Sequence, residues 1–234
     1  MGQGPQYLLI GNGRVSRHMQ RYLRWLHLSF RVWTRAGEQP LETALRGVTH
    51  VLLAISDDAI VPFLESQQTL LESRVVVHFS GSLATPLAWG AHPLMTFSGN
   101  SCPPEEYAQI HFVFDAGAPE FAQLLPGFPN PHHRLAAEQK PLYHALCVLS
   151  GNFTSILWNH FFEALETQLG IPREAAIPYL RRVAANLEGA EHPVTGPLAR
   201  RDKGTVRRNL QALAGDPYQE VYSSFVHAYA PGLS

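Results

Sequence analysis

Short apolar runs alternate with stretches of helical periodicity through the first half of the chain. From Val15 to Leu26 the apolar residues recur every three or four positions, which predicts an amphipathic helix. Another helix is expected from about Ala59, with Asp57 as its N-cap. Apolar runs predict β-strands at residues 7–10, 29–33, 50–55, 74–79 and 110–114. Strands alternating with helices in this way predict an α/β fold with a doubly wound, mostly parallel (Rossmann) sheet.

The pattern changes beyond the middle of the chain. Residues 90–106 contain several prolines and are interpreted as a loop, and residues 126–134 are interpreted as a connection between domains. From Pro141 to Leu169 the apolar positions lie on most sides of one long predicted helix, which is typical of a helix buried in a core or against a second subunit. We therefore predict a Rossmann dinucleotide-binding domain over residues 1–134 and an all-helical substrate and dimerisation domain over residues 135–234.

Further helices are expected in the second half of the chain. Gly170 supplies a stop for the long helix, and Pro172 can start the next one. Pro178 is expected to kink that helix. A loop over residues 192–202 then leads to a last pair of helices from about Lys203.

The composition excludes several classes of protein. The 234 residues are 45% hydrophobic and 16% charged, with a formal net charge of −1, so neither nucleic acid nor an anionic membrane is expected as a partner. No apolar stretch reaches the roughly 18 residues of a membrane span. The two cysteines, Cys102 and Cys147, form no Cys-x-x-Cys pair and so indicate neither a zinc knuckle nor a redox motif. We expect a cytoplasmic protein.

The first candidate for chemistry follows the first predicted strand. Gly11-x-Gly13-x-x-Ser16 lies between that strand and the amphipathic helix, which is the order that a dinucleotide-binding turn requires. Gly11 would allow the tight turn, and Gly13 would let the backbone approach a pyrophosphate at the helix N-terminus. The alternative is a glycine turn that binds nothing. The cofactor contacts predicted from this turn are Gly11, Asn12, Gly13, Arg14 and Val15.

Two further segments are predicted to contact the cofactor. Thr34 and Arg35 follow the second strand, where an acidic residue would bind a ribose 2′-hydroxyl. Arg35 can instead pair with a 2′-phosphate, so NADP is expected in preference to NAD, and a solvated surface arginine is the alternative. Ser56 and Asp57 follow the third strand at the edge that should face the crevice, although Asp57 could serve only as a helix cap.

Several short motifs occur in an order that resembles a known family. They are Gly-x-Gly-Arg-Val at the turn, Arg35, Ser56-Asp57-Asp58, His78-x-Ser80-Gly81, His92-Pro93-Leu94-x-x-Phe97, Lys140-x-x-Tyr143-His144 and Thr195-Gly196-Pro197. The chain resembles uncharacterised Rossmann-like proteins, described as candidate NADP oxidoreductases, that carry a helical C-terminal domain of unknown function. These are similar to pyrroline-5-carboxylate reductase, ketopantoate reductase and the β-hydroxyacid dehydrogenases. The resemblance implies a cofactor domain and a homodimer through the C-terminal helices, but no particular substrate.

Hydride transfer to a carbonyl or imine needs a proton donor beside the substrate heteroatom. His92 is the first candidate, and it lies with Ser80 at or just beyond predicted strand ends. Lys140 and His144 are four residues apart at the start of the long helix and could share a face, with Lys140 as a cationic donor or an anchor for an anionic substrate. A loop histidine and a solvated lysine are the structural alternatives. No metal-ligand pattern occurs, so no metal is expected.

Three functional hypotheses follow from the sequence. The first is an NADP-dependent oxidoreductase that transfers hydride to a small carbonyl or imine substrate. The second is a non-catalytic NADP-binding sensor or assembly protein, and the third is a structural dimer with a degenerate turn. Turnover of NADPH would separate the first from the second, and binding of NADPH or NADH would separate both from the third.

Overall fold

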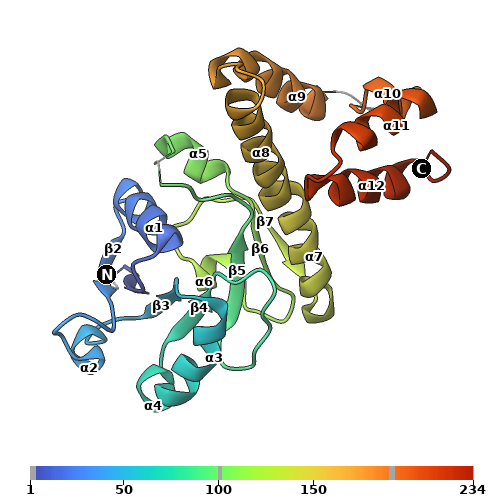
Figure 1. Cartoon of the computed structure of the whole chain (residues 1–234). Helices are drawn as coiled ribbons and strands as arrows, with labels where there is room; N and C mark the ends of the chain where they lie inside the picture. The colour runs from blue at the N-terminus through green and yellow to red at the C-terminus, as the bar shows by residue number, and fades with distance from the viewer. Residues whose placement is uncertain (1–3, 100–101, 190–192, 234) are drawn as a thin grey trace. The chain divides into compact units, whose positions relative to one another are not determined.

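The chain divides into two compact units, Met1–Leu157 and Trp158–Ser234, and the sheet belongs to the first (Figure 1). This computed structural model describes residues 4–99, 102–189 and 193–233. Residues 100–101 and 192, which belong to two predicted loops, lie outside the described residues. The domain boundary that we place after residue 134 stays a prediction.

In the described part of the chain, the strands form one seven-stranded sheet in the order β2-β1-β3-β4-β5-β6-β7. All neighbouring pairs are parallel except β5 and β6. The strands are β1 (Gln6–Ile10), β2 (Ser29–Trp33), β3 (His50–Leu53), β4 (Val75–His78), β5 (Trp89–Pro93), β6 (Phe112–Asp115) and β7 (His132–Leu135). The predicted doubly wound, mostly parallel sheet is confirmed. Chain order reverses beside β1, so a crevice is expected at the carboxyl ends of β1 and β3.

Two strands lie where the sequence predicted none. β5 falls at the edge of the predicted loop over residues 90–106, and β7 begins within the predicted connection over residues 126–134 and ends one residue beyond it. Both interpretations were wrong at these strands because neither contains an apolar run. β5 is held by pairing with β4 on one side and β6 on the other, and β7 pairs with β6. Tertiary pairing therefore overrides the weak local preference for strand.

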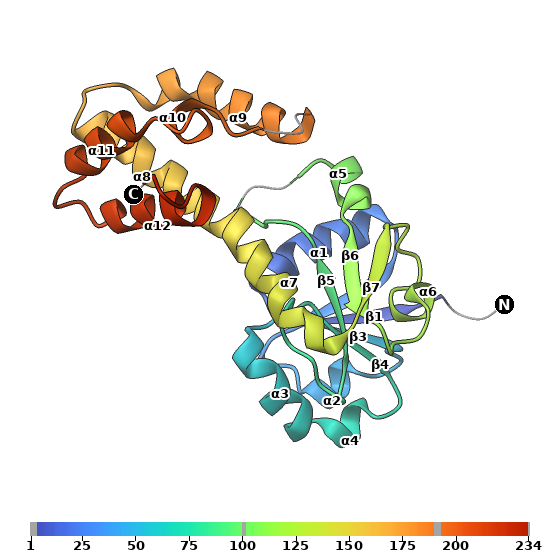
Figure 2. The same ribbon diagram turned by 90° about the vertical axis from the view of Figure 1, so that its right-hand side faces the viewer.

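Helices cover both faces of the sheet, as Figure 2 shows. Successive residues of β1 point to opposite faces, so Tyr7 and Leu9 pack with α1, α5 and α6, while Leu8 and Ile10 pack with α2, α3 and α4. All four of these side chains are buried. The helices are α1 (Arg14–Trp25), α2 (Leu41–Ala44), α3 (Asp57–Ser66), α4 (Gln68–Leu71), α5 (Pro104–Gln109) and α6 (Phe121–Leu124).

The long helix predicted from Pro141 to Leu169 is observed as a continuous helical run with an irregular centre. It follows a 3₁₀ turn (Ala137–Gln139) and consists of α7 (Lys140–Cys147), a π-helical segment (Val148–Asn152) and α8 (Phe153–Thr167). Five of its large apolar side chains are exposed in the single chain, at Leu142, Leu146, Leu149, Phe153 and Ile156. The helix is therefore not buried along these positions within one copy of the chain.

The second unit is helical in its described residues, and its helices pack around two small clusters. One cluster contains Phe162, Leu165 and Ala176, and the other contains Val206 and Val226. The elements after α8 are a 3₁₀ turn (Arg173–Ala176), α9 (Ile177–Gly189), α10 (Gly196–Ala199), α11 (Lys203–Ala212) and α12 (Tyr218–Tyr229). None of the described helices is long and apolar enough to span a bilayer.

The kink predicted at Pro178 is wrong. Pro178 is the second residue of α9, where a backbone N–H would have no partner inside the helix. Proline at this position therefore starts the helix rather than bending it.

Candidate functional site

The glycine turn after β1 has a conformation that only glycine accepts. Gly11 has a φ of 112°, and a Cβ built on it would lie 2.4 Å from the carbonyl oxygen of Ala54. The Gly11 N–H donates to the Trp33 carbonyl oxygen at 2.9 Å, and the Ala54 N–H donates to the Ile10 carbonyl oxygen at 2.9 Å. The turn is therefore held at the ends of β2 and β3.

Ser16 occupies the third position of the Gly-x-Gly pattern and is fully buried. Its hydroxyl donates to the Gly11 carbonyl oxygen at 2.6 Å. The small side chain thus fits between helix and strand and also closes the turn through a hydrogen bond.

Gly13 differs from Gly11 because the protein itself does not require a glycine there. Its φ is −72°, and no protein atom lies within 4 Å of a Cβ built on it. Gly13 is the N-cap of α1, and the first turn of this helix carries Arg14 and no acidic residue. Free N–H groups and a positive helix end beside a basic side chain favour an anion at this point.

A crevice of about 550 Å³ opens beside the turn, at the carboxyl ends of the central strands. Among the predicted cofactor contacts, Thr34 and Arg35 do not line it and lie in the turn after β2, where Arg35 is exposed. The lining residues come from the turn and from the ends of β3 and β4, and are Gly11, Asn12, Gly13, Arg14, Val15, Ala54, Ile55, Ser56, Asp57, Phe79 and Ser80. The other predicted cofactor residues therefore surround one cavity.

Asp57 does not cap α3 as the sequence predicted. The helix begins at Asp57 and Ser56 is its N-cap. The Asp57 carboxylate instead accepts hydrogen bonds from the hydroxyl of Ser80 and, at 3.3 Å, from that of Ser82. The Ser80 oxygen also accepts from the Leu83 N–H at 3.1 Å. Ser80 is therefore held by its neighbours, and Asp57 ties the start of α3 to the segment after β4.

His92 and two residues of α7 meet around Gly81. His92 Nδ1 lies 2.8 Å from the Tyr143 hydroxyl, and the rings of His92 and His144 are 6.0 Å apart. A Cβ built on Gly81 would lie 2.6 Å from Cδ2 of His144 and 3.0 Å from Cδ2 of His92. The absence of a side chain at Gly81 therefore lets β5 and α7 bring these three rings together.

The His92–Tyr143 pair is uncharged at neutral pH. Burial, followed by the nearby His144, lowers the pKa of His92 to about 4. Burial, with a smaller effect from Cys147, raises the pKa of Tyr143 above its usual range. The pair therefore consists of a neutral imidazole and a protonated phenol, both suited to donating a hydrogen bond.

Lys140 is buried rather than solvated. Its ammonium lies 2.6 Å from Oδ1 of Asp115, and Oδ2 of the same carboxylate accepts from the Gly90 N–H. His78 lies beside this pair with no exposed surface, and neither ring nitrogen has a hydrogen-bond partner among the described residues. Burial, with Lys140 next in effect, lowers the pKa of His78 to about 4. The Lys140–Asp115 pair and a neutral His78 thus form a second polar cluster.

Sequence reasoning missed the roles of Asp115 and Tyr143. Asp115 ends β6, which runs antiparallel to β5, so the rule that ligands meet the carboxyl ends of parallel strands gave no signal for it. Tyr143 lies in the Lys140-x-x-Tyr143-His144 motif but was given no role. Among the described residues, no group of three or more His, Cys, Asp or Glu side chains is arranged to hold a metal ion.

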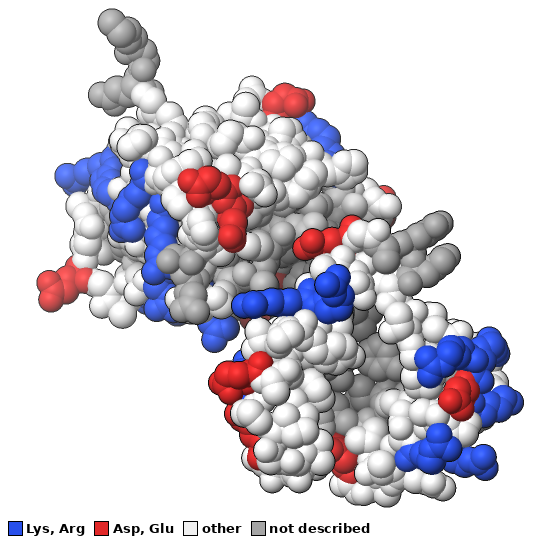
Figure 3. All heavy atoms as spheres, turned by 90° about the horizontal axis from the view of Figure 1, so that it is seen from above, with Lys and Arg blue, Asp and Glu red and all other residues white. Residues whose placement is uncertain are grey.

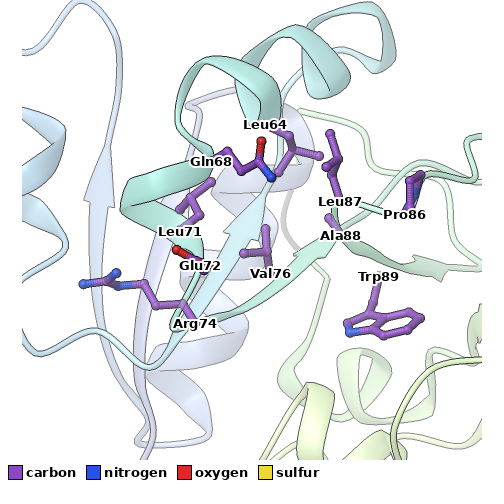
Figure 4. Close-up of a pocket in the computed structure, with 10 residues that line it drawn as sticks. All are labelled: Leu64, Gln68, Leu71, Glu72, Arg74, Val76, Pro86, Leu87, Ala88 and Trp89. Carbon is purple, nitrogen blue, oxygen red and sulfur yellow. The ribbon is translucent and has the colours of Figure 1, made fainter.

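A second cavity of about 250 Å³ lies between α3, α4 and the starts of β4 and β5 (Figure 4). Buried Leu64, Leu71 and Val76 form part of its apolar wall, with Gln68 and Glu72 also lining it. It shares no lining residue with the crevice. Ligands of open α/β sheets bind at the carboxyl ends of the strands, so the crevice is the better candidate site.

Charge on the molecular surface is mixed. On the face that Figure 3 presents, basic side chains of the described residues form several groups with acidic groups among them. This agrees with the net charge of −1 of the whole sequence.

Comparisons with known proteins connect this geometry to a family. Residues 115–228 match the model of a domain of unknown function, DUF2520. A comparison with curated proteins gave no significant match. The fold is similar to that of a candidate NADP oxidoreductase from Bacteroides fragilis, with a TM-score of 0.78 and 20% identity over 96% of this chain and 97% of that one.

Two further solved structures have the same fold at lower identity. An imine reductase from Streptomyces aurantiacus gives a TM-score of 0.62 and 16% identity, over 97% of this chain and 95% of that one. A pyrroline carboxylate reductase from Plasmodium falciparum with NADP bound gives a TM-score of 0.61 and 11% identity, over 96% of this chain and 95% of that one. The predicted resemblance is confirmed: residues 115–228 match the DUF2520 model, and the chain has the fold of solved structures described as a candidate NADP oxidoreductase and a pyrroline carboxylate reductase.

Proposed function

We propose that this protein binds NADP(H) in the crevice beside the glycine turn and transfers hydride to or from a small carbonyl or imine compound. The observation that carries the proposal is the contrast between Gly11 and Gly13. Gly11 is required by its φ and by Ala54, whereas nothing in the described protein requires glycine at position 13. A glycine that leaves space at a helix N-terminus suits the close approach of a pyrophosphate.

NADP is proposed in preference to NAD because of Arg35. This arginine is exposed on the turn after β2, and the Gly11–Trp33 hydrogen bond joins the end of that strand to the glycine turn. A guanidinium at this position can form paired hydrogen bonds with a 2′-phosphate. The pyrroline carboxylate reductase of Plasmodium falciparum has NADP bound, which supports the same choice here.

The neutral His92–Tyr143 pair is the proposed hydrogen-bond donor to the substrate heteroatom. When bound, the nicotinamide supplies or accepts the hydride. Tyr143 stays protonated, and in the tautomer that we propose its hydroxyl donates to Nδ1 of His92, so that the ring proton of the neutral imidazole sits on Nε2. Nε2 can donate to a carbonyl oxygen or an imine nitrogen, and His144 lies close enough to shape the same space.

The decisive test measures cofactor binding and turnover separately. Thermal shift and calorimetry with NADPH and NADH are expected to show preference for NADPH in the wild type and loss of most of that preference in Arg35→Ala. An unchanged preference in the variant would contradict the role of Arg35. Binding of NADPH without oxidation by any member of a panel of ketoacids, aldehydes and imines would favour the non-catalytic sensor, and absence of binding would favour the structural dimer.

We also propose that the protein is a homodimer through its C-terminal helices. The exposed side chains of α7, the π-helical segment and α8 follow a 4-3-4-3 spacing, which places them in one apolar stripe: Leu142, Leu146, Leu149, Phe153 and Ile156. An apolar stripe of this kind is typical of a protein–protein interface. Sedimentation analysis should give a dimer, and Leu146→Glu combined with Phe153→Glu should give a monomer. A wild-type monomer at tens of micromolar would contradict this proposal.

A cytoplasmic location remains part of the proposal. It rests on the chemistry of NADPH-dependent reduction and on two cysteines that are free in the structure. Fractionation of the source cells would test it.

A further inference from the structure

A buried ion pair joins three elements next to the candidate site. Lys140 begins α7, Asp115 ends β6, and Gly90 lies in β5. The carboxylate of Asp115 binds the Lys140 ammonium with one oxygen and the Gly90 N–H with the other. The Lys140 side chain is 5% exposed and that of Asp115 is 15% exposed, so solvent screens the pair only weakly.

Gly90 makes room for the lysine. A Cβ built on Gly90 would lie 2.3 Å from Nζ of Lys140, 3.0 Å from Cε1 of His78 and 3.1 Å from Oδ1 of Asp115. Its φ lies outside the left-handed region, so the backbone conformation does not demand glycine. The requirement at this position therefore comes from the polar cluster around it, and first from the ammonium group, which is the nearest.

The same two elements meet a second time where Tyr143 and His144 contact His92. Gly90 and His92 are two residues apart on β5 and so face the same side of the strand. Lys140 is one helical turn before Tyr143 and His144, so these side chains share a face of α7. Helix α7 and strand β5 therefore make two successive contacts. In the first, Lys140 lies against Gly90, and in the second, Tyr143 and His144 lie against His92.

We propose that Lys140 is a positioning residue: its ion pair with Asp115, across Gly90, fixes α7 on β5 in the register that brings Tyr143 and His144 to His92. Its consequence for catalysis rests on the proposed function, in which the His92–Tyr143 pair donates a hydrogen bond to the substrate. Lys140 itself does not donate the proton, since its ammonium is buried and bonded to a carboxylate. His78, neutral and beside it, adds no charge to this cluster.

The test reports on the His92–Tyr143 contact without cofactor or substrate. Imidazole resonances of isotope-labelled protein are followed against pH, and His92 is assigned by comparison with His92→Gln. Gly90→Ala adds one methyl group, which must displace Nζ of Lys140. Gly117→Ala is the matched control because no protein atom lies within 4 Å of its Cβ and its φ is not in the left-handed region.

In the wild type and in Gly117→Ala, His92 should titrate near pH 4 and show a contact to the Tyr143 ring. In Gly90→Ala, the His92 titration should move by at least one pH unit toward its usual value, and the Tyr143 contact should weaken or disappear. Lys140→Met should give the same changes. If both variants kept the wild-type His92 titration and the Tyr143 contact, the positioning role would be wrong.

A variant pair separates positioning from folding. Lys140→Met leaves the Asp115 charge buried, and Lys140→Met with Asp115→Asn removes both charges. The double variant should recover thermal stability but not the His92 titration of the wild type. Recovery of both by the double variant would mean that the pair serves only stability. Because no assay here uses NADPH, failure of the proposed function would leave these results interpretable.

Discussion

The glycine turn and the contacts of α7, which together make up the proposed site, are built in different ways. The glycine turn is made by neighbours in sequence: Gly11, Gly13 and Ser16 lie within six residues and are completed by the ends of adjoining strands. The side formed by α7 depends on pairs far apart in sequence, since Lys140 meets Asp115 across 25 positions and Tyr143 meets His92 across 51. We therefore expect the glycine turn to keep its structure when residues far from it are changed. The contacts of α7, in contrast, depend on how β5, β6 and α7 assemble.

Removing one partner of the buried ion pair should have the largest effect on stability. Lys140→Met removes the ammonium partner of the Asp115 carboxylate, at an expected cost of about 3–5 kcal/mol in the free energy of unfolding. Urea unfolding followed by circular dichroism measures it. The exposed Lys203→Met is the control and should change the free energy by less than about 0.5 kcal/mol. A loss below about 1 kcal/mol in Lys140→Met would mean that the pair is not a stable part of the α7 side.

Acid should weaken the α7 side through His78. Its pKa is about 4 in the folded protein against 6.5 ordinarily, so below pH 6.5 the unfolded chain binds a proton that the folded chain does not. Neutral His78 therefore makes its full contribution to the free energy of unfolding above about pH 6.5. As the pH falls toward 4, the free energy of unfolding decreases by about 3 kcal/mol through this residue.

Unfolding at pH 7 and near pH 4.5 tests this on the wild type and His78→Leu. On acidification, the free energy of unfolding of the variant should fall by roughly 2–3 kcal/mol less than that of the wild type, because leucine cannot bind a proton. Exposed His133→Leu should behave like the wild type. Equal acid sensitivity of His78→Leu and the wild type would contradict the burial of a neutral imidazole at this position.

On the other side of the site, Gly11→Ala should disturb the turn. The added Cβ meets the Ala54 carbonyl and the residue must keep a φ of 112°, so we expect a cost of about 2–3 kcal/mol and loss of most NADPH affinity. Thermal unfolding and calorimetry measure the two effects. The His92 titration should stay near that of the wild type, because the α7 side is built separately. A Gly11→Ala protein with wild-type stability would refute the conformational requirement.

Ser16→Ala should have the smallest effect of the series. It removes the hydrogen bond to the Gly11 carbonyl, at an expected cost of about 1 kcal/mol, and should reduce NADPH affinity only slightly. Exposed Ser155, whose hydroxyl also donates to a backbone carbonyl, supplies the control Ser155→Ala with a smaller cost. Equal costs for the two variants would mean that the Ser16 bond does not stabilise the turn.

The sequence predicted the glycine-turn side far better than the α7 side. An apolar run, Gly-x-Gly and an amphipathic helix follow one another, so their local pattern was sufficient to predict β1, the turn and α1. β5 carries Gly90, His92 and a terminal proline, and only its two neighbours in the sheet make it a strand. The partnership of Lys140 with Asp115 needs both β5 and β6 in place, so no local pattern could predict it.

The exposed stripe on the long helix illustrates the same limit. Its periodicity correctly predicted a helix, but the burial of Leu142 or Leu149 depends on what lies against it. In the single chain these side chains are 65% and 54% exposed. Sequence periodicity identifies an apolar face and does not identify its partner.

The central claim is that the glycine turn holds the pyrophosphate of NADP(H), and Gly13→Ala tests it most directly. No protein atom lies near its Cβ, so the free energy of unfolding should change by less than about 1 kcal/mol. The dissociation constant of NADPH, measured by calorimetry, should rise at least tenfold, because the methyl group occupies the space into which the phosphates would pack. Unchanged NADPH affinity in a stably folded Gly13→Ala protein, or no binding to the wild type up to millimolar NADPH, would contradict the account.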